Sequence, residues 1–305
     1  MLQVRRILFP TDYSACAEAA LTQAGRFADV LGAQLHVVHV HETPDAHEDD
    51  FAFEGVSRSA LDAIGVVEVT LRWPSVQNAI VRYAKAQDID LIVMGTHGRH
   101  GLNVLMGSVA EAVTRRAHCP VLTVRPNPNA HDPWMLRRIL APVDLSERSR
   151  EGVRYAHAVA QLFNADVKVV HVIDQLPAPV GEVMDVPPIY PQAVIASARS
   201  VVESLVEEEM QGYPAEVEVV VGHAPTELLA QAEAYNADLI LLTSHGRTGL
   251  RRFLLGSVAE KMMRHATCPV FTLKSFGKKL LAPLRTTKRS DSEASSRILE
   301  GCMVG

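Results

Sequence analysis

A glycine-rich stretch near residue 100 is the first segment whose residue types suggest chemistry. It reads GTHGRHG from Gly95, and Gly107 and Ser108 follow at the start of a segment of helical period, residues 108–117. Glycine lets a backbone approach a ligand closely, the first amides of a helix point outward, and the helix dipole favours negative charge. The segment therefore predicts an anion site with phosphate as its natural ligand. For one isolated loop, a crossover with Ser108 as a simple N-cap is an equally good interpretation.

A second loop of the same kind occurs 148 residues later (244 − 96). It reads SHGRTGL from Ser244, and Gly256 and Ser257 open the helical segment after it. Two such loops at matching places favour ligand binding. Neither is a Walker loop, because G-x-x-x-x-G-K-[ST] does not occur, and neither follows the first strand of its unit, where the dinucleotide fingerprint belongs.

One aspartate follows the first predicted strand of each half: Asp12 in PTDYS and Asp144 in PVDLS. In an open α/β sheet, ligands bind at the carboxyl ends of the strands, where the strand order reverses. An aspartate there can accept a hydrogen bond from an exocyclic amine or a ribose hydroxyl. Taken alone, an Asx turn or a helix cap is the favoured interpretation of either residue.

Several histidines could bind a metal or transfer a proton. His97 and His245 lie in the glycine loops, but no Ser, Cys or carboxylate has a fixed spacing to them, so a hydrogen-bonding role is favoured over catalysis. Strand alternation puts His39 and His41 on one face and His36 on the other, so at most two of these three could share an ion. A solvated loop after a strand is favoured there, and we expect neither a metal site nor a catalytic residue.

The elements that position these residues occur in two copies. RRILFPTDYS from Arg5 recurs as RRILAPVDLS from Arg137, and VVHV from Val37 recurs from Val169, both at an offset of 132 residues. The later motifs recur at 148 or 149, so the second copy has gained 16 residues after its second apolar run (148 − 132). A duplication of this kind fixes the architecture of the whole chain.

Each copy alternates short apolar runs with segments of helical period. The runs are continuous and rich in Val, Ile and Leu, which is typical of strands that helices cover on both faces. Between the first two runs, Ser14 is placed as the N-cap of a helix that ends near Leu31. Five β-α units per copy predict an α/β fold with a doubly wound parallel sheet. The runs of the first copy are residues 7–9, 35–40, 66–71, 91–94 and 121–124.

Composition excludes several classes of protein. The 305 residues suggest two domains, and a net charge of −5 with 48% hydrophobic residues is typical of a globular chain rather than a disulfide scaffold or a disordered protein. The acidic balance argues against non-specific nucleic-acid binding. No apolar run reaches the length of a membrane span or a signal peptide, so we expect a cytoplasmic protein. The four cysteines are too dispersed for a zinc site and are expected to be reduced thiols: Cys16, Cys119, Cys268 and Cys302.

The domain boundaries follow from the repeat and from composition. Residues 1–126 and 137–274 are the two predicted domains, and residues 127–136, rich in proline and asparagine, are the predicted linker. Residues 275–305 are rich in Lys, Arg, Ser and Thr with little apolar periodicity, so we predict a disordered tail.

The motifs together resemble the universal stress protein family. Each copy opens with P-x-D-x-S and closes with the glycine loop, a G-S-V-A-E helix and C-P-V, over residues 1–275. The resemblance implies two tandem five-stranded parallel doubly wound sheets of the adenine nucleotide alpha hydrolase-like type, each with strand order 3-2-1-4-5. It also implies that the last strands of the two copies pair, as a pseudo-symmetric dimer within one chain. Covering an exposed sheet edge gives this pairing a physical motive. Two such chains are expected to associate further.

The resemblance also implies a ligand, ATP, which the nucleotide-binding branch of the family holds through G-x-x-G, nine residues and G-[ST]. Carried over, Asp12 would meet adenine or ribose, and Val40 would line the base. In the first copy ribose and phosphates would lie against Gly95, Gly98, Gly107, Ser108 and Val109. The matching positions of the second copy are Asp144, Val172, Gly246, Gly256, Ser257 and Val258.

Neither copy fits this pattern completely. The spacer of the first copy has eight residues, Arg99 to Met106, and that of the second has nine, Arg247 to Leu255. One missing residue would rotate the helix amides by about 100°, unless the loop absorbs it. In the second copy Thr243 replaces the first glycine and adds bulk where the backbone should approach the ligand. We hypothesise that both halves bind adenine nucleotide with unequal affinity, with a slight advantage for the second.

The resulting expectation is a stress-response protein that binds ATP, with Mg²⁺ as an optional companion, and acts on an unidentified protein partner according to occupancy. A scaffold of the same fold that binds no nucleotide is the alternative. A slow ATP hydrolase is a third hypothesis, but it needs a positioned base and a metal-binding carboxylate, and the sequence nominates none beyond Asp12 and Asp144.

Overall fold

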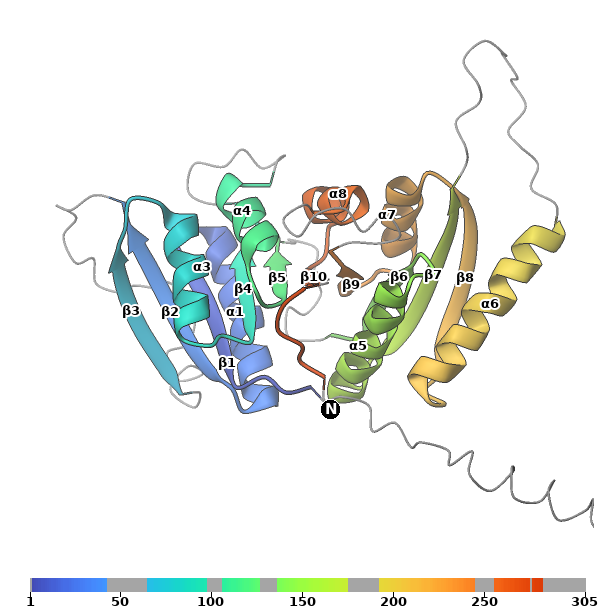
Figure 1. Cartoon of the computed structure of the whole chain (residues 1–305), viewed down its shortest axis with the longest axis horizontal. Helices are drawn as coiled ribbons and strands as arrows, with labels where there is room; N and C mark the ends of the chain where they lie inside the picture. The colour runs from blue at the N-terminus through green and yellow to red at the C-terminus, as the bar shows by residue number, and fades with distance from the viewer. Residues whose placement is uncertain are drawn as a thin grey trace, which may run out of the picture.

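Strands and helices alternate along the chain as the sequence predicts. A computed structural model describes residues 2–42, 65–97, 106–126, 136–174, 192–244, 255–274 and 276–281, and Figure 1 shows the arrangement. The strands of the first half are β1 (Arg6–Thr11), β2 (Gln34–His41), β3 (Val66–Arg72), β4 (Leu91–Gly95) and β5 (Val121–Val124). Its helices are α1 (Ala15–Leu31), α3 (Val76–Ala86) and α4 (Ser108–Arg116).

The second half repeats this order with one further helix among its described residues. Its strands are β6 (Arg138–Val143), β7 (Asp166–Asp174), β8 (Ala215–Gly222), β9 (Leu239–Thr243) and β10 (Val270–Leu273). Its helices are α5 (Glu147–Phe163), α6 (Gln192–Met210), α7 (Ala224–Ala234) and α8 (Ser257–His265). None of the described helices combines the length and the apolarity that a membrane span requires.

All ten strands belong to one sheet, in the order β3-β2-β1-β4-β5-β10-β9-β6-β7-β8. Counted in its own strands, each half has the expected order 3-2-1-4-5. Pairings within a half are parallel, whereas β5 and β10 pair antiparallel with Leu122 opposite Phe271. The expected pairing of the last strands is therefore confirmed, and it joins the two five-stranded parallel sheets into one mixed sheet of ten strands. The physical reason is that two otherwise exposed edges satisfy each other's backbone hydrogen bonds.

Helices cover both faces of this sheet, and each face has one apolar core that runs through both halves. One core contains Phe27 from α1, Tyr155 from α5 and Val202 from α6. The other contains Ile80 from α3 and Met262 from α8. The two repeats therefore share their cores instead of burying two separate ones.

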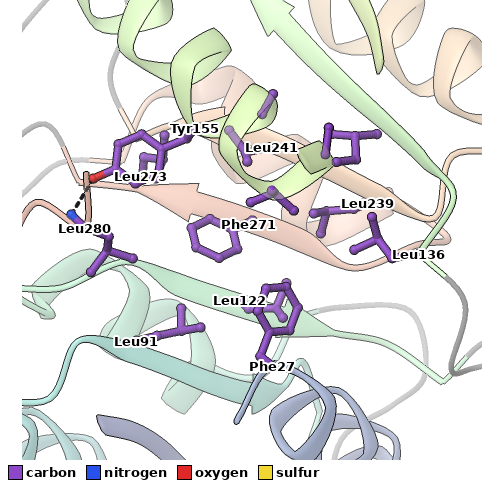
Figure 2. Close-up of a cluster of buried hydrophobic side chains, with 14 of the residues drawn as sticks. Phe27, Leu91, Leu122, Leu136, Tyr155, Leu239, Leu241, Phe271, Leu273 and Leu280 are labelled. Atoms are coloured by element: carbon purple, nitrogen blue, oxygen red, sulfur yellow. Dashed lines mark hydrogen bonds between the residues drawn. The ribbon is translucent and has the colours of Figure 1, made fainter. Parts of the chain in front are cut away.

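The junction of the halves is fully buried. Figure 2 shows Phe27, Leu122 and Phe271 together in its centre, and none of the three is more than 1% exposed. The ring centroid of Phe27 lies 6.3 Å from that of Phe271, which belongs to the other half. Each large apolar side chain buried in this way contributes roughly 1.5–3 kcal/mol, so the junction contributes substantially to stability.

Serine caps fix the start of α1 and α5. Ser14 Oγ accepts from Ala17 N at 3.2 Å, and Ser146 Oγ accepts from Ser149 N at 3.3 Å, which confirms the predicted cap at Ser14. At its other end α1 stops at Gly32, whose φ of +61° is the left-handed conformation that glycine tolerates.

The cysteines that the structure describes are free and buried. Burial raises the pKa of both Cys119 and Cys268 to about 12, so these thiols stay protonated at neutral pH and pack as small apolar groups. This agrees with their expected packing role at the entry to the last strands.

Residues 276–281, which we call the strap, bind across the junction. Leu280 N donates to Tyr155 Oη at 2.6 Å, as Figure 2 shows, and Leu280 itself is 1% exposed. Gln3 N donates to Leu280 O, and Lys278 N donates to His118 O, both at 2.7 Å. The strap thus contacts both halves, and the prediction of a disordered tail from residue 275 is wrong for these six residues. Residues 282–305 lie outside the described residues.

Gly277 is the residue on which docking of the strap depends. Its φ is +139°, and a Cβ there would lie 2.1 Å from His118 O. G277A is therefore expected to displace the strap, lower the melting temperature and speed tryptic cleavage after Lys278 at least several-fold. The control is G32A, which has a φ of +61° and nothing within 4 Å of the new Cβ. It should cost about 1–2 kcal/mol without exposing the strap to trypsin. Equal cleavage of both variants would contradict this account.

Lys274 directly follows β10 and is buried, with 7% of its surface exposed. Burial lowers its pKa from 10.5 to about 8, because desolvation penalises the charged ammonium. At a pH between these two pKa values, the unfolded chain binds a proton that the folded chain lacks. The contribution of Lys274 to the free energy of unfolding therefore becomes more favourable as pH rises.

K274M is accordingly expected to stabilise the protein at pH 7, by at most about 3 kcal/mol. The advantage over the wild type should be constant below pH 8 and should shrink as pH rises from 8 towards 10.5. Urea unfolding of both proteins at pH 6, 7, 8 and 9.5 measures this difference. A destabilised K274M, or a difference independent of pH, would contradict the burial of a charged amine at this position.

Candidate functional site

Each half has one point where its strand order reverses, between β1 and β4 in the first half and between β6 and β9 in the second. Ile7 pairs with Leu91 there, and Ile139 pairs with Leu239. Successive connections leave opposite faces of the sheet at such a point and open a crevice at the carboxyl ends of the strands. The loops that follow β1, β4, β6 and β9 are the segments that the sequence predicts as ligand-binding.

The two glycine loops are closed by the same hydrogen bond. Gly107 N donates to Thr96 O at 2.7 Å, and Gly256 N donates to Ser244 O at 2.8 Å. Both glycines are N-caps with φ −64° and ψ of 145° and 147°. The one-residue difference between the loops lies between these anchors (107 − 96 = 11 against 256 − 244 = 12), outside the described residues. The predicted rotation of the helix amides is therefore absent, because both helices start from the same anchored glycine.

Among the residues that the structure describes, no side chain caps the first amides of α4 and α8. Their N-cap residues, Gly107 and Gly256, have no side chain that could accept a hydrogen bond, in contrast to Ser14 and Ser146 at the starts of α1 and α5. The first intrahelical bonds run from Glu111 N to Gly107 O and from Glu260 N to Gly256 O. The amides of the residues between stand at the positive end of the helix dipole and can donate to an anion. Ser108, Val109, Ser257 and Val258 lie in these first turns.

Asp12 and Asp144 directly follow β1 and β6, at the two strand switch points, and are half-buried. Each accepts through Oδ1 from a backbone amide two residues on, Ser14 N and Ser146 N, at 3.1 Å in both halves. The Asx turn that was favoured from sequence alone is thus present. It also holds both carboxylates at the strand ends, beside the crevices.

The residue after each of these aspartates has an unusual backbone. Tyr13 has a φ of +60° and Leu145 a φ of +63°, a left-handed conformation that costs a non-glycine residue about 1–2 kcal/mol. The same strain at equivalent positions of both repeats means that the Asx turn and the helix cap determine the backbone there, against the residue's own preference. The orientation of the two aspartates is fixed by that backbone.

Gly95 and its counterpart Thr243 are explained by packing. A Cβ at Gly95 would lie 2.9 Å from Cys16 Sγ and 3.0 Å from Cys16 O, in helix α1. In the second half Arg148 takes the place of Cys16 (16 + 132), and Thr243 Cγ2 lies 3.7 Å from the place of a Cβ on Gly152 of α5, an ordinary van der Waals contact. The methyl group of Thr243 is thus directed at α5.

Of the remaining predicted site residues, some lie within the described part of the chain and others lie outside it. Val40 is 8% exposed and packs on the face of the sheet that α3 and α4 cover, and Val172 packs at the equivalent place in the second half. Gly98 and Gly246 lie outside the described residues. His97 Nδ1 is 2.8 Å from Thr96 Oγ1, which fits the hydrogen-bonding role favoured from sequence.

Histidines near the strand ends are engaged with neighbouring groups. His36 Nδ1 lies 2.8 Å from Tyr83 Oη, and His39 Nδ1 lies 2.8 Å from Thr11 O. Burial lowers the pKa of His36, so its neutral form is favoured. Within the described ranges, no three His, Cys, Asp or Glu side chains are arranged to hold a metal ion.

Sequence reasoning missed a contact between the two helices that follow the glycine loops. Arg264 Nη2 lies 3.1 Å from Glu111 Oε2, which joins the last turn of α8 to the first turn of α4. Arg125 Nη2 also donates to Arg264 O at 2.5 Å. The antiparallel pairing of β5 and β10 was the available signal, since it places α4 beside α8.

The packing account of Gly95 predicts opposite effects of two glycine substitutions. G95A should destabilise the protein by about 1–3 kcal/mol, because the new methyl group meets the Cys16 carbonyl. G152A should be neutral or stabilising by up to about 1 kcal/mol, because the contact at 3.7 Å is ordinary and alanine favours a helix. Thermal unfolding of both variants checks this, and equal melting temperatures would refute it.

Known proteins share this arrangement. The sequence matches the universal stress protein family twice, over residues 3–125 and 135–274. A universal stress protein of Mycolicibacterium smegmatis is 27% identical over 297 residues, 88% of this chain and 96% of the relative. One of Mycobacterium tuberculosis is 28% identical over 294 residues, with the same shares. A solved universal stress protein of Archaeoglobus fulgidus has the same fold, with a TM-score of 0.62 at 20% identity over 90% of this chain and 98% of that one.

The match spans both repeats, and each repeat has the strand order, glycine-capped helix and strand-end aspartate described above. The chain therefore belongs to the universal stress protein family, with two family domains in tandem.

Proposed function

We propose that each half binds an adenine nucleotide, with ATP as the leading candidate, and that the protein acts as a nucleotide-dependent regulatory module in the stress response of the cytoplasm. One observation supports this most directly. In both halves a helix without a side-chain cap starts from a glycine that is anchored by the same backbone hydrogen bond, beside an aspartate at the strand switch point. Phosphates suit the helix amides, and a ribose or an amine suits the carboxylate.

In the first half the phosphates would lie at Gly107, Ser108 and Val109 and the ribose near Asp12. Val40 would line the base from the next strand. The second half offers the same order from Gly256, Ser257 and Val258 through Asp144 to Val172. Mg²⁺ would enter with the phosphates, because magnesium is commonly held by one or two carboxylates plus substrate phosphates, and Asp12 and Asp144 lie at the strand switch points.

The overall negative charge is compatible with this ligand. A nucleotide site needs local amide donors and a helix dipole rather than a positive protein surface. Hydrolysis would need a positioned base in addition. Asp12 and Asp144 are the described candidates, and each already accepts a hydrogen bond in its Asx turn. Binding is therefore the activity that the geometry supports best.

Aspartate and asparagine substitutions at the helix N-caps test this proposal. Both residues are favoured N-caps, so G107D and G107N should fold, and both place a Cβ 3.2 Å from Thr96 O. The two variants differ mainly in charge. We expect G107D to bind ATP at least tenfold more weakly than G107N in the first half, because the carboxylate repels phosphate. G256D and G256N should differ in the same way in the second half.

Isothermal titration with ATP measures both sites, and circular dichroism confirms the fold of each variant. Equal binding by the aspartate and asparagine variants would contradict phosphate binding at the helix starts. Mass spectrometry of molecules released from the denatured wild type separates the alternatives. Bound ATP supports the proposal, ADP together with turnover supports a hydrolase, and no nucleotide in combination with no titration heat supports a scaffold.

A further inference from the structure

Trp73 is an exposed aromatic residue at the carboxyl edge of the first half. It directly follows β3, its amide donates to His41 O at 2.9 Å, and its surface is 39% exposed. The register pairs Val40 with Leu71. Trp73 is two residues after Leu71 and therefore lies on the same face of the sheet as Val40. Arg82 of α3, which covers that face, places its guanidinium carbon 4.8 Å from the ring centroid.

The second half differs at this position. Val172 pairs with Val220 there, so the counterpart of Trp73 is Gly222. A Cβ at Gly222 would lie 2.5 Å from Glu227 Oε1, so the Glu227 side chain fills the space beside this glycine. The first half therefore has an indole and a guanidinium at the place where the second half has a bare backbone and a carboxylate.

The strand order relates Trp73 to the proposed phosphate site. From β4, which leads to the glycine loop, the edge runs through β1 and β2 to β3. Neighbouring strands are about 4.8 Å apart, so roughly 14 Å separate the phosphate end from the strand that ends at Trp73. A nucleotide lying along this edge has its phosphates at α4, its ribose near Asp12 and its base at Val40 and Trp73.

We propose that Trp73 stacks on the adenine of the nucleotide in the first half and makes this half the tighter of the two adenine sites, which reverses the order of affinity expected from the sequence of the loops. The proposal rests on the proposed function. Any base can stack on an aromatic side chain, and such stacking contributes substantially to binding affinity. A guanidinium on one face of the indole holds the ring in place for a base on the other face. The second half has no ring at the equivalent position.

Intrinsic fluorescence tests the contact, because the chain has two tryptophans, Trp73 and Trp134. In W134F, Trp73 is the sole emitter, and ATP should quench its fluorescence with saturation. Adding G107D should shift this quenching to at least tenfold higher ATP concentration, whereas adding G256D should leave it unchanged. Unchanged Trp73 emission at saturating ATP would overturn the proposal.

Affinity measurements separate stacking from a structural role. W73A should weaken ATP binding in the first half at least tenfold, W73F should restore most of it, and neither should alter binding of inorganic tripolyphosphate, which has no base. Equal loss of ATP and tripolyphosphate in W73A, or no loss of either, would overturn the inference. If the wild type shows no ATP heat at all, the proposed function itself fails. If ATP binds and G107D weakens it but W73A does not, only the role of Trp73 fails.

Discussion

The antiparallel pairing of β5 and β10 is the interaction on which the rest of the structure depends. It turns two five-stranded sheets into one, centres the molecule on Leu122 and Phe271, and lets each face carry a single core through both repeats. Because the strands of the two halves run in opposite directions, the two crevices open at opposite edges of the sheet. The same pairing places α4 beside α8 and lets the strap reach both halves.

Apolar burial rather than charge holds the halves together. The Glu111 to Arg264 pair crosses the junction, but its side chains are 23% and 33% exposed, and exposed pairs typically contribute 1 kcal/mol or less. A single fully buried side chain such as Phe271 contributes more. At Lys274, which directly follows β10, a charge instead costs stability. Burial of its amine lowers its pKa, because desolvation penalises the charged form.

The sequence predicted the elements well because their signals are local or repeated. Continuous Val and Ile runs indicated covered strands, Ser14 indicated a cap, and the duplication indicated equal sheets. The strap was missed because residues 276–281 are too few for periodicity, and their partners, Tyr155 and His118, are distant in sequence. The packing role of Gly95 was missed because a glycine can be required by a neighbouring helix as well as by a ligand, and only coordinates reveal that a Cβ there would meet Cys16 of α1.

The two halves differ most where side chains, rather than backbone, define the crevice. Backbone hydrogen bonds set the end proposed to bind phosphate, and these bonds are the same at Gly107 and Gly256 despite loops of different length. The far end of the edge is set by single side chains, Trp73 with Arg82 in one half and Glu227 beside Gly222 in the other. A backbone-determined end tolerates changes of sequence, whereas an end built from one side chain changes character with one substitution. Repeats joined through a shared sheet can therefore keep one kind of anion site while their other ends diverge.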